Sequence, residues 1–307
     1  MGGFDTFLTR LVPTEKINLG STSFQIPVSR LRGAGAGKKL LITAGVDGDE
    51  YAGMEAAYRL ISEFSKTPFY GELTIIPIVN MPGFNANTNR NPMDDKFPKY
   101  IYPGRETGTS TEQLCWWLSQ FARRSDFWLD LHGGTLNEVI VPFIESWKSG
   151  NKTIDDLVAS IVATMHVRFA TSEPVRSKTK ILAEHGCGYL LAESGELGKI
   201  DEKAVTQHVT WAHQVMGSLK MIEMDLPLHP KQIFQRVTEY SSHHDGYWHA
   251  RYTSCVEVHR GDELGAITSR GGSVFETITV KEDGRLLWLN TGSLVRRGDI
   301  VAGVGII

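Results

Sequence analysis

The feature that most constrains the fold is an alternation of apolar runs and amphipathic segments up to about residue 222. Four short apolar runs bounded by turn residues indicate buried strands: 39–45, 73–79, 126–131 and 188–193. Four segments that repeat apolar residues at helical spacing lie between or after them: 49–65, 109–122, 153–166 and 201–221. This order predicts an α/β domain with a largely parallel sheet.

Two other parts of this region carry weaker signals. Residues 80–105 are rich in proline and asparagine and show almost no periodicity, so they predict a long loop. The first 35 residues are polar and broken by glycines, and we assign no regular element to them. Because long ordered loops often carry function, residues 80–105 are expected to contribute to a site.

Beyond the last helical segment the sequence is rich in β-branched residues and glycine turns. Within it, segments 258–265 and 295–302 resemble each other, which indicates a small β-sandwich or barrel made of two similar halves. A proline-containing linker precedes this part. We therefore expect two domains, an α/β domain over residues 1–228 and an all-β domain over residues 229–307.

Charge and composition disfavour two classes of partner. The chain has 32 basic and 35 acidic residues, and this balance lacks the clustered positive charge that nucleic-acid binding needs. No run of 18 apolar residues predicts a membrane span, and Met1–Thr14 has no apolar core of a signal peptide. The three cysteines fit neither a disulfide framework nor a zinc-cysteine spacing, so we expect a cytoplasmic protein. The sequence leaves open whether the protein forms a homo-oligomer, since no residue pattern argues for or against one.

Polar residues follow three of the predicted strands, where open α/β sheets place their ligand sites. Asp47 and Glu50 straddle a strand-to-helix turn, His132 ends a second strand, and Glu193 ends a third. Two carboxylates and one imidazole, with a further position left for water, form a candidate catalytic metal site. Asp130, two residues before His132, is expected to have a structural or supporting role.

Several motifs in order along the chain resemble those of one family, the succinylglutamate desuccinylase/aspartoacylase family of the zinc carboxypeptidase superfamily. The matching motifs are Ala44–Glu50, Val79–Phe84, Tyr102–Gly104, Asp130–Gly134 and Glu193–Gly195. The resemblance implies a zinc-carboxypeptidase-like α/β/α sandwich with a small C-terminal all-β domain. It also implies metal-dependent hydrolysis of the amide in a small N-acyl amino acid or a related acyl amide.

The resemblance also implies roles for individual residues. Glu50 and His132 correspond to metal ligands, with Asp47 at the third ligand position and zinc as the expected ion. Glu193 corresponds to the general base and acid that activates water and then protonates the leaving amine. Arg90 corresponds to the residue that polarises the scissile carbonyl. Substrate binding is expected at three further positions: Asn80, Lys99 and Tyr100.

Two positions depart from the family pattern. Asp47 stands where a histidine is usual, which lowers the net charge of a zinc site from about +1 to near 0 and makes harder ions such as Mn²⁺ more competitive. Lys99-Tyr100 stands where an Asn-Arg pair is usual. Because lysine binds a carboxylate as a point charge rather than as a fork, a less anionic substrate is expected.

Simpler interpretations stay open at each position. Glu50 is also consistent with an acid in the first turn of a helix, His132 with a hydrogen-bonded structural histidine, and Glu193 with a salt-bridged carboxylate. Arg90 is also consistent with a loop tether. The histidines of the β-rich part, His243, His244 and His249, are expected at the surface or in packing. At the level of function, the alternatives are a non-catalytic binding protein on the same fold and a carboxypeptidase-type peptidase.

Overall fold

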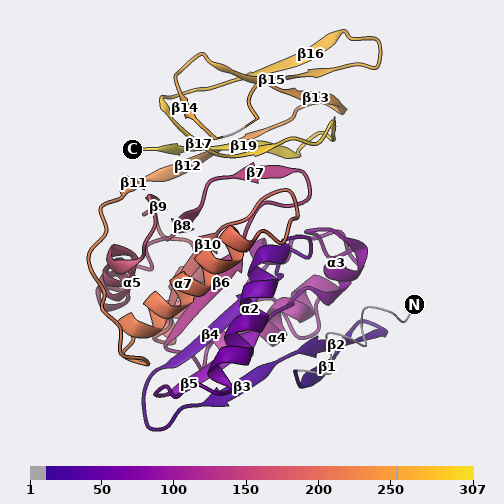
Figure 1. The fold of residues 1–307 in the computed structure, drawn as a ribbon. Coiled ribbons are helices and arrows are strands. Elements are labelled where there is room, and N and C mark those ends of the chain that lie inside the picture. The colour runs from indigo at the N-terminus through magenta and orange to yellow at the C-terminus, as the bar shows by residue number, and fades with distance from the viewer. Residues whose placement is uncertain (1–11, 254) are drawn as a thin grey trace.

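The computed structural model describes residues 12–253 and 255–307, so most of Met1–Thr14 lies outside the described residues. Its largest sheet has eight strands in the described part of the chain, in the order β11-β9-β8-β10-β6-β4-β5-β3 (Figure 1). The bounds are β3 Ser29–Arg32, β4 Lys39–Ala44, β5 Glu72–Ile76, β6 Phe127–His132, β8 Phe143–Glu145, β9 Phe169–Thr171, β10 Gly188–Glu193 and β11 Gln232–Phe234. All of these neighbours run parallel except β3 with β5 and β8 with β10, which confirms the predicted largely parallel sheet.

Helices cover both faces of this sheet. They are α2 Tyr51–Phe64, α4 Ser110–Ala122, α5 Lys152–Thr164, α6 Ser177–Glu184 and α7 Glu202–Ser218. Figure 1 shows α2 and α7 side by side over one face, where Gly53 of α2 closely approaches Leu131 of β6. Successive strand residues point to opposite faces, so Trp128 and Asp130 face the other side, near α4 and α6.

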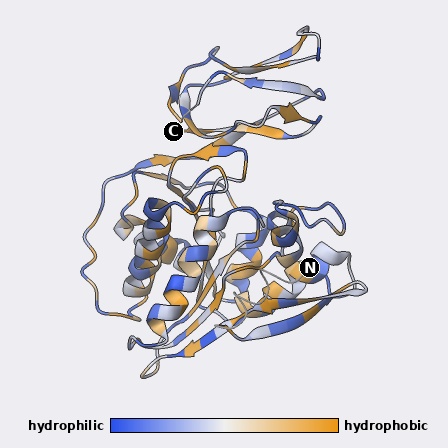
Figure 2. Cartoon of the chain, turned by 45° about the vertical axis from the view of Figure 1, so that its right-hand side comes forward, coloured by the Kyte–Doolittle hydropathy of each residue, from blue (hydrophilic) through white to orange (hydrophobic). Residues whose placement is uncertain are grey.

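Burial on both faces explains why the central strands are nearly continuous apolar runs. Every residue of β6 is buried, and so is every residue of β4 after Lys39. In Figure 2 orange, the hydrophobic colour, lies on stretches of several strands, and the helices alternate between hydrophobic and hydrophilic stripes. None of the helices in the described part of the chain is long and apolar enough to span a membrane.

The two regions whose sequence carries only weak signals, the N-terminal region and residues 80–105, contain short elements of secondary structure. The polar N-terminal region forms the hairpin of β1 (Thr14–Leu19) and β2 (Thr22–Pro27), followed by β3. The expected loop 80–105 contains α3 (Met81–Ala86) and the 3₁₀ helix η1 (Pro98–Tyr100). The prediction of an element-free loop was therefore wrong, because elements of three to six residues are too short to show a period.

The C-terminal part consists of two antiparallel sheets. One is built from β12 (Arg236–Ser241), β14 (Glu257–Val258), β17 (Gly284–Asn290) and β19 (Ile300–Ile306), and the other from β13 (Gly246–Ala250), β15 (Glu263–Thr268), β16 (Val274–Thr279) and β18 (Leu294–Val295). Leu264 and Val301 are fully buried in a core that the two sheets share. The two similar segments form equivalent units, because each leads from a two-residue strand through a glycine turn into a long strand.

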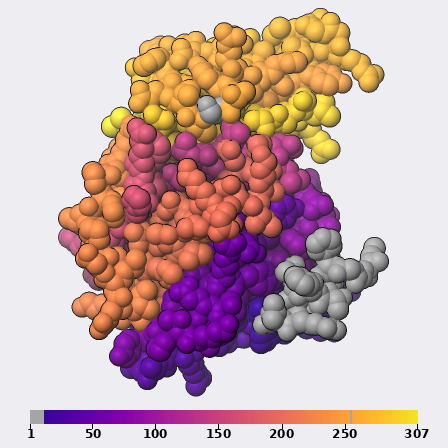
Figure 3. All heavy atoms as spheres, in the orientation of Figure 1, coloured from indigo at the N-terminus to yellow at the C-terminus, as the bar shows by residue number. Residues whose placement is uncertain are grey.

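Strands are exchanged between the two parts. The strand β7 (Glu138–Ile140) follows β6 in the chain but pairs with β17 of the C-terminal sheet. Conversely, β11 lies after residue 228 but pairs with β9 of the large sheet. A small core between the parts contains Phe143, Phe234 and Leu287, and Figure 3 shows the C-terminal part seated directly on the α/β part. The domain boundary at residues 228 and 229 stays a prediction.

Candidate metal and active site

Three adjacent strands of the large sheet end at the same edge and carry the predicted site residues. In the parallel register, Glu193 of β10 lies opposite His132 of β6, and Leu131 of β6 lies opposite Ala44 of β4. The turn that contains Asp47 begins directly after Ala44. The carboxyl ends of β10, β6 and β4 therefore bring together residues that are far apart in the sequence, as the strand-end argument predicts.

The turn after β4 is held in place by two glycines. Gly45 has a φ of 62°, in the left-handed region that favours glycine. A Cβ atom on Gly48 would lie 2.3 Å from backbone atoms of Gly83 and Phe84, so this turn packs directly against α3. The close packing fixes the position of Asp47, which precedes Gly48 and is fully buried.

Glu50 occupies the N-cap position of α2, but its side chain does not cap the helix. Instead, Glu50 Oε2 lies 2.9 Å from His132 Nδ1 and accepts a hydrogen bond of 3.2 Å from the backbone N–H of Gly133. This arrangement argues against the interpretation of Glu50 as only a helix-end acid. Its side chain points into the strand-end cluster and is buried.

Asp47, Glu50 and His132 together present one ligand atom each within 4.8 Å of one another, and all three are buried. Asp47 Oδ2 lies 3.7 Å from His132 Nδ1. Among the described residues, neither carboxylate oxygen of Asp47 has a partner with hydrogen-bond geometry. Two buried carboxylates that converge with an imidazole nitrogen fit a divalent cation.

Asp130 supports the imidazole from behind. Its Oδ2 lies 3.4 Å from His132 Nε2 and accepts a 3.0 Å hydrogen bond from the hydroxyl of Tyr189, while its Oδ1 accepts a 2.5 Å bond from Thr43 Oγ1. Lys178 Nζ lies 3.5 Å from the same Oδ2. Asp130 thus has the supporting role expected from the sequence, and Tyr189 and Lys178 are partners that sequence reasoning missed.

The cluster is electrostatically coupled. Burial raises the pKa of Glu50 to about 8, although the charge of His132 opposes this. Burial lowers the pKa of His132, but the charges of Glu50 and Asp130 outweigh it and raise that pKa well above its ordinary value. Burial acts to raise the pKa of Asp47, but the charges and hydrogen bonds of Lys99 and His132 together outweigh it and hold that pKa below its usual range. The site thus concentrates carboxylates that a cation would stabilise.

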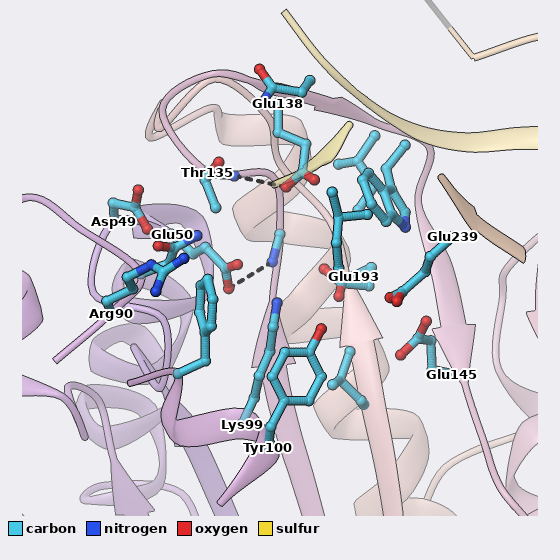
Figure 4. A pocket seen from close by; sticks show the side chains of 18 of the residues that line it. Asp49, Glu50, Arg90, Lys99, Tyr100, Thr135, Glu138, Glu145, Glu193 and Glu239 are labelled. Carbon is cyan, nitrogen blue, oxygen red and sulfur yellow. Dashed lines mark hydrogen bonds between the residues drawn. The ribbon is translucent and has the colours of Figure 1, made fainter. Parts of the chain in front are cut away.

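Glu193 faces a cavity of about 1010 Å³ that opens beside this cluster (Figure 4). Burial, followed by the nearby charge of Glu50, raises the pKa of Glu193 well above its ordinary value. Its Oε2 is buried and has no hydrogen-bond partner among the described residues. The salt-bridged interpretation of Glu193 therefore finds no partner in the described part of the chain.

The predicted loop residues lie in different surroundings. Arg90 lines the cavity, but its Nη1 donates to the carbonyl of Asp95 at 3.0 Å and its guanidinium lies 4.1 Å from the ring centre of Phe97. Arg90 therefore acts as a loop tether, and its role at the scissile carbonyl stays a prediction. Asn80 is fully buried and caps α3, accepting from the N–H of Gly83 at 3.1 Å. It does not line the cavity, so substrate binding by Asn80 finds no support in this geometry.

Lys99 and Tyr100 lie in η1, which borders the cavity. Lys99 Nζ forms an ion pair of 2.9 Å with Asp47 Oδ2, whereas Tyr100 is half-exposed. Figure 4 shows the Lys99 ammonium pointing between Glu50 and Glu193. The sequence predicted both residues at the substrate site, and both line the cavity. The contact between Lys99 and a predicted metal ligand was not predicted from the sequence.

Three further carboxylates line the cavity, and sequence reasoning did not predict them. Glu138 comes from β7, Glu145 from β8 and Glu239 from β12, and Figure 4 shows the last two near each other on one wall. Burial raises the pKa of Glu145 to about 7, and the neighbouring charge of Glu173 adds to this. None of these positions follows a recognisable motif. The C-terminal histidines do not line the cavity; His243, for example, pairs with a glutamate on β16.

Fold and site together define an α/β protein with a candidate metal site at the carboxyl ends of three central strands. The chain belongs to the succinylglutamate desuccinylase/aspartoacylase family, whose catalytic-domain model matches residues 36–219. It is also 34% identical, over 122 residues, to the N-alpha-acetyl-L-2,4-diaminobutyric acid deacetylase of Halomonas elongata. That alignment covers 39% of this chain and 35% of the length of the relative.

Solved structures share the fold over nearly the whole chain. The succinylglutamate desuccinylase/aspartoacylase of Rhodobacter sphaeroides superposes with a TM-score of 0.81 and 20% identity, covering 95% of this chain and 94% of that one. The product-bound ectoine utilization protein EutE (DoeB) of Ruegeria pomeroyi gives a TM-score of 0.81 and 21% identity, covering 96% and 99%. These likenesses confirm the expected family fold, with its C-terminal β sheets.

Proposed function

We propose that this protein is a divalent-metal-dependent deacylase that hydrolyses the amide of a small N-acyl amino acid. The observation that carries the proposal is the convergence of Asp47, Glu50 and His132 beside Glu193 at a large cavity. Family membership and the similarity to the deacetylase of Halomonas elongata support the same reaction class.

The donor set determines which ion would suit the site. Zn²⁺ takes carboxylate and imidazole ligands and keeps an open position in catalytic sites, and two carboxylates also suit the harder Mn²⁺. Such an ion would supply Lewis acidity to the amide carbonyl and to the attacking water. Asp130 would keep His132 oriented with Nδ1 toward Asp47 and Glu50.

Glu193 is the proposed general base and acid. It would accept a proton from the attacking water and return it to the leaving amine. A raised pKa suits this role, since the carboxyl must change its protonation state near neutral pH. Arg90, on the same cavity, is the proposed donor to the carbonyl oxygen as negative charge develops there.

The charge of the cavity favours a substrate that carries a positive group. Glu145 and Glu239 lie on one wall, where the charges of Arg176 and Lys99 offset that of Glu145 only in part. An ammonium on the substrate would pair with these carboxylates, whereas a second carboxylate would be repelled. The relative's name specifies a diaminobutyric acid, whose additional amine fits this wall. We therefore propose N-acyl diamino acids as the substrate class.

One observation favours a second candidate function, a non-catalytic binding protein. The ammonium of Lys99 lies on the carboxylate of Asp47 that a metal would use. The same contact disfavours a carboxypeptidase-type peptidase, because it occupies the lysine that would hold the terminal carboxylate of a peptide.

Metal analysis and a substrate panel test the proposal. Protein purified without chelator is expected to contain zinc or manganese, and to hydrolyse N-acetyl-2,4-diaminobutyrate faster than N-acetylaspartate or N-succinylglutamate. Removing the metal with a chelator should abolish hydrolysis, and adding it back should restore it. Metal binding without hydrolysis of any N-acyl compound would instead support the binding protein. Protein that stays metal-free after loading would contradict the metal-dependent deacylase.

A further inference from the structure

Lys99 and Asp47 are placed so that the two departures from the family pattern compensate each other. We propose that they act as one unit, in which the ammonium of Lys99 restores the positive charge that the aspartate removes from the metal site. This inference rests on the proposed metal-dependent function and concerns the chain's own charge balance around the ion.

One carboxylate oxygen of Asp47 faces both the ammonium of Lys99 and the imidazole of His132. Asp47 Oδ2 lies 2.9 Å from Lys99 Nζ and 3.7 Å from His132 Nδ1, so the ammonium lies against the same oxygen that faces the other ligands. Asp47 is fully buried, whereas the Lys99 side chain is 30% exposed and reaches it from the cavity side. The pair therefore connects the metal position to the cavity.

The position of Lys99 is set by its backbone. It is the central residue of η1, where the N–H of Tyr100 donates to the carbonyl of Phe97 at 3.2 Å and the N–H of Ile101 donates to that of Pro98 at 3.0 Å. Pro98 is buried, and its carbonyl also accepts from the thiol of Cys115. The lysine thus projects from an anchored turn toward Asp47.

The formal charges of the metal site show how Lys99 offsets Asp47. Zn²⁺ with Asp47, Glu50 and a neutral His132 has a net charge of about 0, and the ammonium of Lys99 raises it to about +1. About +1 is also the charge of zinc held by two histidines and one glutamate. The aspartate and lysine together are therefore equivalent in charge to one neutral histidine ligand.

The unit should weaken metal binding while it stabilises the metal-free protein. The ammonium competes with the ion for Asp47 Oδ2 and repels it, since both are positive. Without metal, the same ammonium neutralises a carboxylate that would otherwise be buried and unpaired. Replacing Lys99 by an uncharged residue should therefore change these two properties in opposite directions.

Zinc affinity, measured by competition with a chromophoric chelator, tests the unit. The Lys99→Met variant should bind zinc at least about tenfold more tightly than the wild type, and its metal-free form should melt at a lower temperature. Lys99→Gln should show the same directions if Lys99→Met folds poorly, and Lys99→Arg should stay near the wild type. Lys96→Met is the matched control, because Lys96 lies in the same loop but bonds to Thr109.

A double variant separates charge from local packing. In Asp47→His, which supplies a neutral ligand, the further change Lys99→Met should tighten zinc binding by less than it does in the wild type, because competition for the shared carboxylate is gone and only the repulsion between ammonium and ion remains to be removed. Equal zinc affinity in the wild type, Lys99→Met and Lys99→Gln, or weaker binding by both variants, would overturn the inference and leave the proposed function intact. Failure of every folded variant to bind zinc would overturn the proposed function as well.

Discussion

Asp130 Oδ2 lies 3.4 Å from His132 Nε2, on the opposite side of the ring from Glu50. The two residues are two positions apart on β6, so their side chains point to the same face of the sheet. A carboxylate beside Nε2 favours the ring proton on that nitrogen, which would leave the lone pair of Nδ1 directed at Asp47 and Glu50 when a metal is bound. The strand itself thus supplies both a candidate ligand and the group that would orient it.

The first prediction concerns this support. Asp130→Asn should weaken zinc binding by about 10- to 100-fold, because the amide no longer fixes the orientation of His132. Tyr189→Phe should have a smaller effect, since it removes only one of the hydrogen bonds to Asp130. Zinc titration of both variants, with circular dichroism to confirm folding, measures this. Unchanged affinity in folded Asp130→Asn would contradict the role of Asp130.

The second prediction concerns proton transfer. Glu193→Gln should lower the deacylation rate by about 10²- to 10⁴-fold, because an amide side chain no longer exchanges the proton. Zinc affinity should stay close to the wild-type value, since Glu193 is not among the three grouped ligands. Glu196→Gln, three residues along the chain and exposed, is the control and should keep full activity. A full rate in Glu193→Gln would rule out Glu193 as the base.

The third prediction concerns substrate charge. Glu145→Gln should lower kcat/KM for N-acetyl-2,4-diaminobutyrate by about 10- to 100-fold, the effect of losing a hydrogen bond between charged groups. The uncharged analogue N-acetyl-2-aminobutyrate should be affected little. Glu257→Gln, at an exposed position on β14, should leave both substrates unaffected. Equal losses for the charged and uncharged substrates would show that Glu145 does not recognise the amine.

The fourth prediction concerns stability in acid. His208 of α7 is fully buried, its Nε2 lies 2.9 Å from the carbonyl oxygen of Ser194, and burial lowers its pKa from 6.5 to about 4. Between these values the unfolded chain binds a proton that the native state does not. The free energy of unfolding should therefore fall as pH drops from 6.5 to 4, by about 3 kcal/mol from this group.

Urea denaturation across that range measures the effect of His208. The His208→Gln variant keeps a hydrogen-bond donor but does not titrate, so its stability should fall by less over the same pH range. His185→Gln, at an exposed position, should behave like the wild type. Parallel pH profiles for the wild type and His208→Gln would show that this histidine does not contribute.

The sequence predicts the ligand cluster because of a property of parallel sheets. Asp47, Glu50 and His132 follow strands whose carboxyl ends meet at one edge, so their position in the chain was enough to place them together. Glu145 was not predictable in this way. It lies in a strand of three residues, too short for a periodic signal, and its neighbour on the wall, Glu239, comes from the C-terminal sheet.

Lys99 shows a different limit of sequence reasoning. The family pattern identified its position as relevant to the site, but its contact with Asp47 depends on the path of a loop without hydrophobic periodicity. Lys178 is similar, since α6 carries a weak pattern and its approach to Asp130 depends on how that helix packs on the sheet. Contacts that arise only from packing between distant elements have no signature in the local sequence.

The exchange of β7 and β11 has a consequence for how the chain can be divided. Cutting between residues 228 and 229 would separate β9 from β11 and β17 from β7, so both fragments would expose unpaired backbone donors and acceptors. Such bare strand edges promote aggregation. Expression of either half alone is therefore expected to yield insoluble material, and the cavity can be studied only in a polypeptide that retains both halves.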